Sequence, residues 1–134
     1  MGILLPDDKP LLALCQLAGS ALAMGNALVI VPSPVSPLSA TDFYQVLETS
    51  DVPAGTLNIV TGNREELAKT LSEHDDVDAI WYSGEKEGGK FVQAASTGNM
   101  KQTWVMSASG ELPEIDAILR HSTQVKNIWV PYGA

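Results

Sequence analysis

Apolar and polar positions divide most of the chain into two kinds of segment that alternate. Short, mainly apolar runs occur at residues 3–5, 28–31, 57–60, 77–82 and 103–106, and the run at residues 28–31 is continuous, as is typical of a strand buried on both faces. Between them lie longer segments with apolar residues at helical spacing, at residues 11–24, 39–49, 63–74 and 87–97. This alternation predicts an α/β fold: a parallel sheet of about five strands with helices on both faces and right-handed crossovers.

Local signals mark where several of these elements begin and end. Pro10 suits the first turn of the first helix, and Gly25-Asn26 predicts its end in left-handed geometry. Asn63 is a favourable N-cap, with Glu66 at the spacing of a capping box. These residues support the helix assignments independently of the apolar spacing.

The last part of the chain departs from the alternating pattern. Residues 115–121 predict a short helix, and residues 125–130 predict a strand that Pro131 ends. A lone strand cannot satisfy its own backbone groups, so this one is expected to pair with another chain or with another part of a longer protein. We therefore divide the chain into residues 1–110, the sheet domain, and residues 111–134, a C-terminal helix and tail.

Composition restricts the partners. The 134 residues fit one domain, and 16 acidic against 8 basic residues give a formal net charge of −8. This charge disfavours nucleic acid and anionic membrane surfaces, which would be repelled, and it favours a neutral, cationic or protein partner. Residues 11–31 are uncharged and long enough for a membrane span, but the helix stop at Gly25-Asn26 argues against one.

Cysteine usage gives no reason to expect an oxidising compartment. Cys15 is the only cysteine, so no internal disulfide can form, and the first residues lack the basic start of a secretory signal. We expect a cytoplasmic protein. Cys15 lies among apolar residues of the first helix and is predicted to be buried and structural.

Six stretches, in order and at family spacing, resemble the cofactor-binding domain of the aldehyde dehydrogenase superfamily. They are Ala21-Leu-Ala-Met-Gly-Asn26, Val29-Ile-Val-Pro-Ser33, Pro37-Leu-Ser39, Val52-Pro-Ala-Gly-Thr-Leu-Asn-Ile-Val-Thr-Gly62, Asp76-Val-Asp-Ala-Ile80 and Ser83-Gly84. The resemblance implies a Rossmann-like sheet. Residues 121–130 are similar to the family's last strand, which bridges subunits, so the resemblance implies that the domain holding the nucleophilic cysteine is skipped. The chain looks most like the truncated C-terminal unit of aldehyde dehydrogenase family 16.

The resemblance also locates the positions where the family's catalytic groups would lie. The Asn whose amide stabilises the oxyanion matches Asp8, a carboxylate that would oppose the developing negative charge. The general base, the first residue of the family's Glu-Leu-Gly-Gly motif, matches Met106 in the stretch Met106-Ser-Ala-Ser109, and a thioether accepts no proton at neutral pH. The resemblance therefore implies no catalytic residue in this chain.

Cofactor positions are altered as well. The Lys and Glu that hold the adenine ribose match Val31 and Pro34, which cannot form those hydrogen bonds, and the family's Gly-Ser at the pyrophosphate matches Gly84 and Glu85. The Glu85 carboxylate beside a pyrophosphate would cost about 1–4 kcal/mol. Lys86 could offset part of this, but we interpret it as solvated. We expect no bound NAD or NADP.

No metal site is expected either. The two histidines, His74 and His121, lie far apart in the sequence, and His74 suits a helix C-terminus. The acidic residues around 73–78 lack the spacing of a calcium-binding loop. Solvated surface roles are the simpler interpretation of both features.

Two functions remain open, and an unrelated small α/β regulator is a third and weaker alternative. The first is a non-catalytic pseudoenzyme that acts as an oligomerisation or protein-interaction module, as a homodimer or against a dehydrogenase unit of the same chain. The second is an NAD(P)-binding component of an aldehyde oxidoreductase. The first predicts an interface formed by the tail strand, at Gln124, Val125, Lys126, Asn127, Ile128, Trp129 and Val130.

Overall fold

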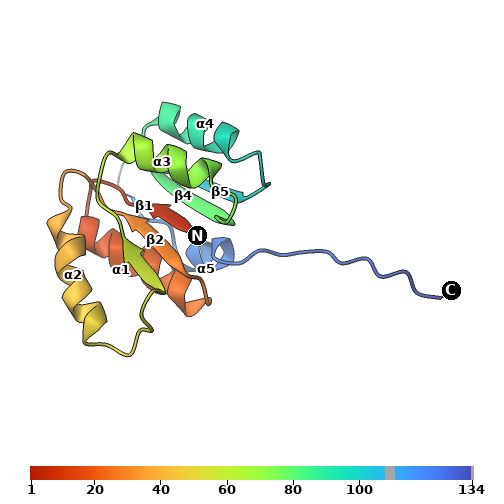
Figure 1. Cartoon of the computed structure of the whole chain (residues 1–134), viewed down its shortest axis with the longest axis horizontal. Helices are drawn as coiled ribbons and strands as arrows, with labels where there is room; N and C mark the ends of the chain where they lie inside the picture. Colours follow the sequence, from red (N-terminus) through yellow and green to blue (C-terminus); the bar gives the residue numbers. More distant parts are fainter. Residues whose placement is uncertain (108–110, 134) are drawn as a thin grey trace.

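A computed structural model describes residues 1–107 and 111–133. Over these residues the elements follow the order β1 (Gly2–Leu4), α1 (Pro10–Ala23), β2 (Leu28–Val31), α2 (Leu38–Glu48), β3 (Leu57–Ile59), α3 (Arg64–Glu73), β4 (Ala79–Gly84), α4 (Lys86–Ala95), β5 (Gln102–Ser107) and α5 (Ile115–His121). All strand pairs are parallel, and the sheet order is β3-β2-β1-β4-β5 (Figure 1). The predicted five-stranded parallel α/β sheet is confirmed.

The middle of the sheet is the strand that comes first in the sequence. Ile3 of β1 lies opposite Ile30 of β2 on one side and Trp81 of β4 on the other. The chain builds β2 and β3 outward on one side, then returns past β1 to build β4 and β5 on the other. Strand order therefore reverses between β1 and β4, and this is the topological switch point of the sheet.

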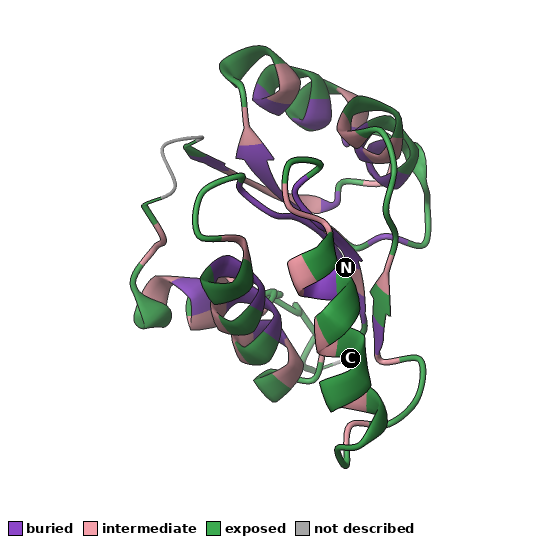
Figure 2. Ribbon diagram, turned by 90° about the vertical axis from the view of Figure 1, so that its left-hand side faces the viewer, coloured by how far each residue is buried: buried purple, intermediate pink, exposed green. Residues whose placement is uncertain are grey.

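Helices cover both faces of the sheet, as predicted. Helices α1, α2 and α5 lie on one face and α3 and α4 on the other (Figure 1). The first layer buries Leu14, Leu17 and Ile118 against the sheet, and the second buries Ala68 and Val92. Burial is accordingly concentrated on the sheet and on the inner sides of the helices (Figure 2).

The predicted helix ends at Gly25 and Asn63 have a clear structural basis. Gly25 has φ +84°, the left-handed geometry that ends α1. The Asn63 side-chain oxygen accepts hydrogen bonds from the backbone N–H groups of Glu65 at 2.9 Å and Glu66 at 3.2 Å, so it caps α3. Both signals are local in sequence and are confirmed.

Strand β4 lies two residues later than the predicted strand at 77–82. Ser83 and Gly84 were expected to turn toward the next helix, but they pair with Met106 and Ser107 of β5. The pairing carries β4 through to Gly84, and α4 starts directly after Glu85. Register with a neighbouring strand, which the local sequence does not encode, decides this boundary.

Helix α5 belongs to the same core as the sheet. Ile118 is fully buried, and the side-chain amide of Gln16 in α1 donates to the Pro113 carbonyl at 2.9 Å. The Asn26 amide donates to the Ser122 carbonyl at 2.9 Å. These contacts fix α5 on α1, directly before the chain leaves the body of the molecule.

Residues 123–133, called the tail below, extend away from the body (Figure 1). Residues 125–130 form no strand in the single chain; the predicted strand is expected to pair with another chain, so it stays a prediction. A strand needs a neighbour to accept and donate its backbone hydrogen bonds, and among the described residues none lies beside the tail. Trp129 in consequence is 94% exposed and Val125 is 89% exposed.

Cys15 is exposed, so the prediction of a buried cysteine is also wrong. The buried stripe of α1 is formed by Ala13, Leu14, Leu17, Ala18 and Ala21. Position 15 lies outside this i, i+3, i+4 series and faces solvent. The position of residue 15 around the helix axis, and not its apolar neighbours in sequence, decides whether it is buried.

Helix α1 is uncharged but contains only 14 residues. Within residues 1–107 and 111–133, no helix has the length and apolar character needed to cross a membrane.

Candidate functional site

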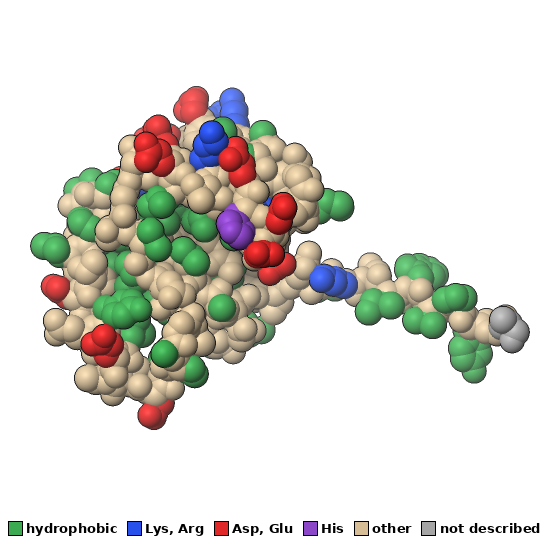
Figure 3. Space-filling view, in the orientation of Figure 1, with side chains coloured by type: hydrophobic (Ala, Val, Ile, Leu, Met, Phe, Trp, Pro, Cys, Tyr) green, Lys and Arg blue, Asp and Glu red, His purple; other side chains and the backbone are tan. Residues whose placement is uncertain are grey.

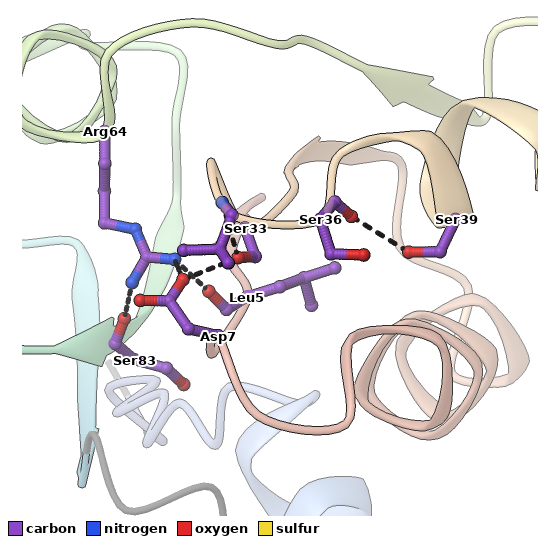
Figure 4. A network of polar contacts seen from close by, with 8 residues as sticks. Leu5, Asp7, Ser33, Ser36, Ser39, Arg64 and Ser83 are labelled. Atoms are coloured by element: carbon purple, nitrogen blue, oxygen red, sulfur yellow. Dashed lines mark hydrogen bonds and ion pairs between the residues drawn. The ribbon is translucent and has the colours of Figure 1, made fainter.

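The carboxyl ends of β1 and β4 are where an open parallel sheet usually binds its ligand. In this chain an arginine side chain lies there. Arg64, the first residue of α3, donates from Nη1 to the Ser83 carbonyl and from Nη2 to the Leu5 carbonyl, each at 2.7 Å (Figure 4). The guanidinium therefore bridges the end of β4 and the residue that follows β1.

An ion pair completes this network. Arg64 Nη2 lies 2.7 Å from Asp7 Oδ1, and the Ser33 hydroxyl donates to the same oxygen at 2.6 Å. The Val35 N–H in turn donates to the Ser33 hydroxyl at 3.1 Å. The loops after β1 and β2, the end of β4 and the start of α3 are thus joined by one set of contacts, which we call the switch-point network.

Most of the interactions of the Arg64 guanidinium are made within this network. Its side chain is 13% exposed, whereas that of Asp7 is 52% exposed. Bidentate donation from a guanidinium to carbonyls, together with a carboxylate, is a strong and directional arrangement. Arg64 consequently fills the crevice and has few donors left for an incoming anion.

A cavity of about 250 Å³ lies beside the switch-point network. Its lining includes four carboxylates and one guanidinium, with Pro34 and the glycines of the α4 start. The acidic members are Asp7, Glu65, Glu85 and Glu87. Their charges oppose a pyrophosphate, because like charges at close range repel by about 1–4 kcal/mol per pair at intermediate dielectric.

Tyr82 of β4 forms the floor of this region. Its residue is 4% exposed, and its hydroxyl lies against the first turn of α4. A Cβ at Gly84 would come within 2.5 Å of that hydroxyl, and a Cβ at Gly88 would overlap it. Both positions therefore require glycine as long as the ring keeps this place.

Burial raises the pKa of the Tyr82 hydroxyl above its usual value of 10.0, which is the largest effect on it. The Arg64 guanidinium acts in the opposite direction. Glu65, Glu85 and Asp7 raise the pKa further, because each disfavours a second negative charge. The upward direction of the pKa shift therefore follows mainly from burial of the hydroxyl.

The residues that the resemblance matches to the family's cofactor positions lie in several environments. Val31 is 1% exposed and packs in the core beneath α3, while Pro34 is exposed and lines the 250 Å³ cavity. Gly84 ends β4, and Glu85 is the N-cap of α4, although its side chain caps no backbone N–H. The start of α4 thus carries an exposed carboxylate where the resemblance puts a pyrophosphate.

The two residues that the resemblance matches to the family's catalytic positions, Asp8 and Met106, lie in different environments. Asp8 is exposed in the loop after β1. Met106 is 8% exposed and belongs to the core cluster on the α1 and α5 side. Residues 108 and 109, which complete the match to the family's motif, lie outside the described residues.

Metal-ligating side chains do not gather within the described ranges 1–107 and 111–133, where no group of three or more His, Cys, Asp or Glu could hold an ion. His74 is the C-cap of α3, as expected, and its Nδ1 accepts from the Asp76 N–H at 3.2 Å. His121 stacks on Trp104 with ring centroids 4.0 Å apart. Trp104 also contacts the fully buried Trp81 edge-on at 5.1 Å.

Two important side chains were missed from the sequence. One is Arg64, whose position directly after the Asn63 cap, following the third strand, was the available signal. The other is Lys101, which donates from Nζ to the Leu71 carbonyl at 3.0 Å and the His74 carbonyl at 2.7 Å, at the end of α3. Burial lowers the pKa of this ammonium group, against the opposing effects of Asp75 and Asp78.

The sequence is similar to aldehyde dehydrogenases. Residues 1–113 match the sequence model of the aldehyde dehydrogenase family. The chain is 39% identical over 113 residues to the NADP/NAD-dependent aldehyde dehydrogenase PuuC of Escherichia coli, covering 84% of this chain and 23% of that protein. It is 31% identical over 137 residues to an aldehyde dehydrogenase of Agaricus bisporus, covering 99% of this chain and 26% of that protein.

Solved structures of aldehyde dehydrogenases share this fold. An indole-3-acetaldehyde dehydrogenase crystallised with NAD⁺ superposes with a TM-score of 0.75 and 33% identity, over 79% of this chain and 22% of that one. The aldehyde dehydrogenase KauB of Pseudomonas aeruginosa superposes with a TM-score of 0.75 and 32% identity, over 79% of this chain and 22% of that one. The chain spans about a quarter of the length of the curated relatives it matches. On the extent of these matches, the chain belongs to the aldehyde dehydrogenase family.

Proposed function

We propose that this chain is a non-catalytic aldehyde-dehydrogenase-like domain that acts as an oligomerisation or protein-interaction module, within a longer chain of family 16. The observation that carries the proposal is the switch-point network. Arg64 and Asp7 fill the crevice with contacts internal to the fold, beside a cavity lined mainly by carboxylates. A site arranged in this way is unsuited to a dinucleotide.

The residues at the family's catalytic positions support the same proposal. An exposed Asp8 cannot donate to an oxyanion, and the Met106 thioether cannot serve as a base. Cys15 is exposed on α1, within the helical layer opposite α3 and α4. Accordingly we propose no catalytic residue and no bound cofactor for this chain alone, and a cytoplasmic location.

The tail supports the interaction role. Its apolar side chains are almost fully solvated: Val125, Ile128, Trp129, Val130 and Tyr132 are 75–104% exposed. Figure 3 shows hydrophobic side chains along the extended tail. Exposed contiguous apolar surface of this kind marks protein-interaction segments, and the tail backbone is free to add to a sheet edge. The partner would be a second copy or a dehydrogenase unit of the same chain.

The match to the family's last strand rests on the pattern of the tail alone. The alignment with the Agaricus bisporus relative takes in 99% of this chain within 26% of that protein. It therefore contains no gap of several hundred residues, and it lends no support to a distant last strand. The interaction role depends on the exposure of the tail and not on that match.

The alternative is an NAD(P)-binding component of an aldehyde oxidoreductase. One relative is named NADP/NAD-dependent, and one structural neighbour holds NAD⁺. The fold that this chain shares with them is the argument in favour. Two features oppose dinucleotide binding: the carboxylates that line the 250 Å³ cavity, and the contacts that Arg64 already makes within the fold.

The association is tested by measuring the mass of the chain in solution by light scattering over a range of concentrations. We expect an oligomer that Lys126→Pro disrupts, because proline removes a backbone donor and restricts the tail. Lys126→Ala is the matched control, since it removes the charge and keeps the N–H. A monomer at every concentration, or equal disruption by both variants, would contradict association through a tail strand.

A further inference from the structure

Strand β5 forms one edge of the sheet, and among residues 1–107 and 111–133 no strand lies on its outer side. The Gln102 N–H donates to the Asp78 carbonyl at 2.9 Å, on the β4 side. Backbone groups of successive strand residues point to alternate sides, so Thr103 and Val105 direct theirs toward the open edge. Edge groups of this kind are a template for pairing with another strand.

The tail leaves the body next to this edge. His121, the last residue of α5, stacks on Trp104 of β5. Both β5 and the strand predicted at residues 125–130 contain six residues, whereas β3, at the other edge of the sheet, contains three. Of the two open edges, β5 is therefore the one that α5 contacts, and it is long enough for the whole predicted strand.

The tail of the same chain is poorly placed for a parallel pairing with β5. The β4–α4–β5 crossover leads outward to this edge with its helix on the α3–α4 face, whereas α5 lies on the face of α1. A parallel strand formed outside β5 after α5 would make a crossover of the opposite hand. Since about 98% of crossovers in parallel sheets are right-handed, two of opposite hand in one sheet are disfavoured.

An antiparallel pairing within the chain is out of reach. It would have to begin at the carboxyl end of β5, but the Ser122 carbonyl accepts from the Asn26 amide at 2.9 Å, close to where β2 begins. Only residues 123 and 124 remain before the predicted strand, and they span about 7 Å. The six residues of β5 extend over about 20 Å. A strand that pairs with β5 therefore comes from another chain.

Charge favours the tail of a second copy as this strand. Within residues 123–133 Lys126 is the only charged residue, whereas the whole chain has 16 acidic and 8 basic residues. A cavity of about 410 Å³ beside β5 includes the carboxylates of Glu111 and Glu114 in its lining. The tail is thus a positively charged segment that the acidic body of a second copy attracts.

The same cavity offers cover for apolar side chains of an added strand. Its lining also contains Trp104 and Met106 of β5, together with Leu112 and Pro113. Every second side chain of a strand at this edge would point to this face of the sheet. Trp129, which is 94% exposed in the single chain, is the largest apolar side chain that such pairing would cover.

We propose that the outer edge of β5 binds the tail of a second copy as a sixth strand, and that two copies exchange tails in this way. The proposal rests on the proposed function, association through the tail, and adds the surface that receives it. In a two-fold arrangement each chain supplies one tail and one β5 edge. The assembly then closes as a dimer, and neither β5 edge stays open to further chains.

Intermolecular paramagnetic broadening locates the tail of the second copy. A chain carrying Cys15→Ser and Tyr132→Cys receives a nitroxide at residue 132, outside the predicted strand, and is mixed with an equal amount of isotope-labelled parent chain. Only amides of the parent chain are observed, so any loss of signal arises from a tail of the other copy. We expect partial loss of the Thr103, Trp104 and Val105 signals. Amides of β3, four strand spacings or about 19 Å away, should keep theirs.

A variant pair tests the edge itself. Thr103→Pro removes an outward N–H of β5 and should weaken dimerisation by about 10-fold, measured by light scattering over a range of concentrations. Proline is tolerated at such an edge position because it takes no hydrogen bond from the ladder with β4. Thr103→Ala keeps the N–H and is the matched control, with a change below about 2-fold. Urea denaturation checks that both variants fold, and the broadening experiment, which leaves β5 unchanged, decides if Thr103→Pro does not.

Two results would overturn the β5 site alone: a dimer whose signal loss falls on β3 or another surface and not on β5, or equal effects of Thr103→Pro and Thr103→Ala on dimerisation. Association through the tail would then stand with a different receiving surface. A monomer at every concentration would contradict both the β5 site and the proposed association.

Discussion

The Arg64 side chain joins the loop after β1 to the end of β4. It satisfies the carbonyls of Leu5 and Ser83 and neutralises Asp7, so the carboxyl edge of the sheet is closed by the fold itself. Removing the guanidinium would take a donor from two carbonyls and from Asp7, which would keep only the hydrogen bond from the Ser33 hydroxyl. The stability of the domain should therefore depend on this residue.

We expect Arg64→Met to lower the free energy of unfolding by about 2–3 kcal/mol. The Leu5 and Ser83 carbonyls and the Asp7 carboxylate would lose charge-assisted hydrogen bonds from a largely buried guanidinium. Urea denaturation at neutral pH measures the effect. Arg120→Met, which changes an exposed arginine in the last turn of α5, is the control and should shift stability by less than about 0.5 kcal/mol. Equal effects of the two variants would refute the role assigned to Arg64.

Tyr82 gives a pH prediction. Its folded-state pKa is raised, so the folded chain binds the phenolic proton more tightly than the unfolded chain does. The resulting stabilisation is fully present below pH 10 and is lost as the pH rises above it. Urea denaturation at pH 8 and at about pH 10.5 should show a smaller loss of stability on alkalinisation for Tyr82→Phe than for the parent chain. An unchanged pH dependence in the variant would contradict the shift.

Residue-level features could be predicted from the sequence only when their partners are close in sequence. Asn63 caps N–H groups two and three residues away, so its role was visible. Arg64 contacts Leu5, Asp7 and Ser83, which come from loops brought together by the sheet order. Cys15 was predicted as buried because its neighbours are apolar, although the phase of α1 places it in solvent.

At the scale of elements, most helices and strands lie within about two residues of their predicted positions, within the usual ambiguity of element ends. Helix α3 is the best specified, because a cap begins it and Lys101 binds the carbonyls at its end. The end of β4 was less predictable, since pairing with β5 sets it. The N-cap of α3 can therefore be tested by a single substitution, whereas the end of β4 depends on a neighbouring strand.

Asn63→Ala should lower the free energy of unfolding by about 1 kcal/mol, because two N–H groups of α3 lose their acceptor. Asn63→Asp keeps that acceptor and should stay close to the parent chain. Thermal or urea denaturation of the three proteins gives the comparison. Similar losses in both variants would mean that the cap is not what stabilises the start of α3.

For the whole molecule, the parallel sheet and its two helical layers could be predicted from the alternation of apolar runs and helical spacing. The conformation of the tail could not, because a strand at residues 125–130 requires a pairing partner, and none lies beside it among residues 1–107 and 111–133. The switch-point network was equally invisible before the strand order was known. It decides the central claim, since a dinucleotide would have to compete with Arg64 and Asp7 at the crevice.

The most direct test of this claim is a calorimetric titration of the domain with NAD and NADP at low salt, up to about 1 mM cofactor, where a Kd of 1 mM corresponds to about −4 kcal/mol. We expect no saturable heat with either cofactor. Saturable binding tighter than about 0.1 mM would contradict it, and would make the NAD(P)-binding component the better description of this chain.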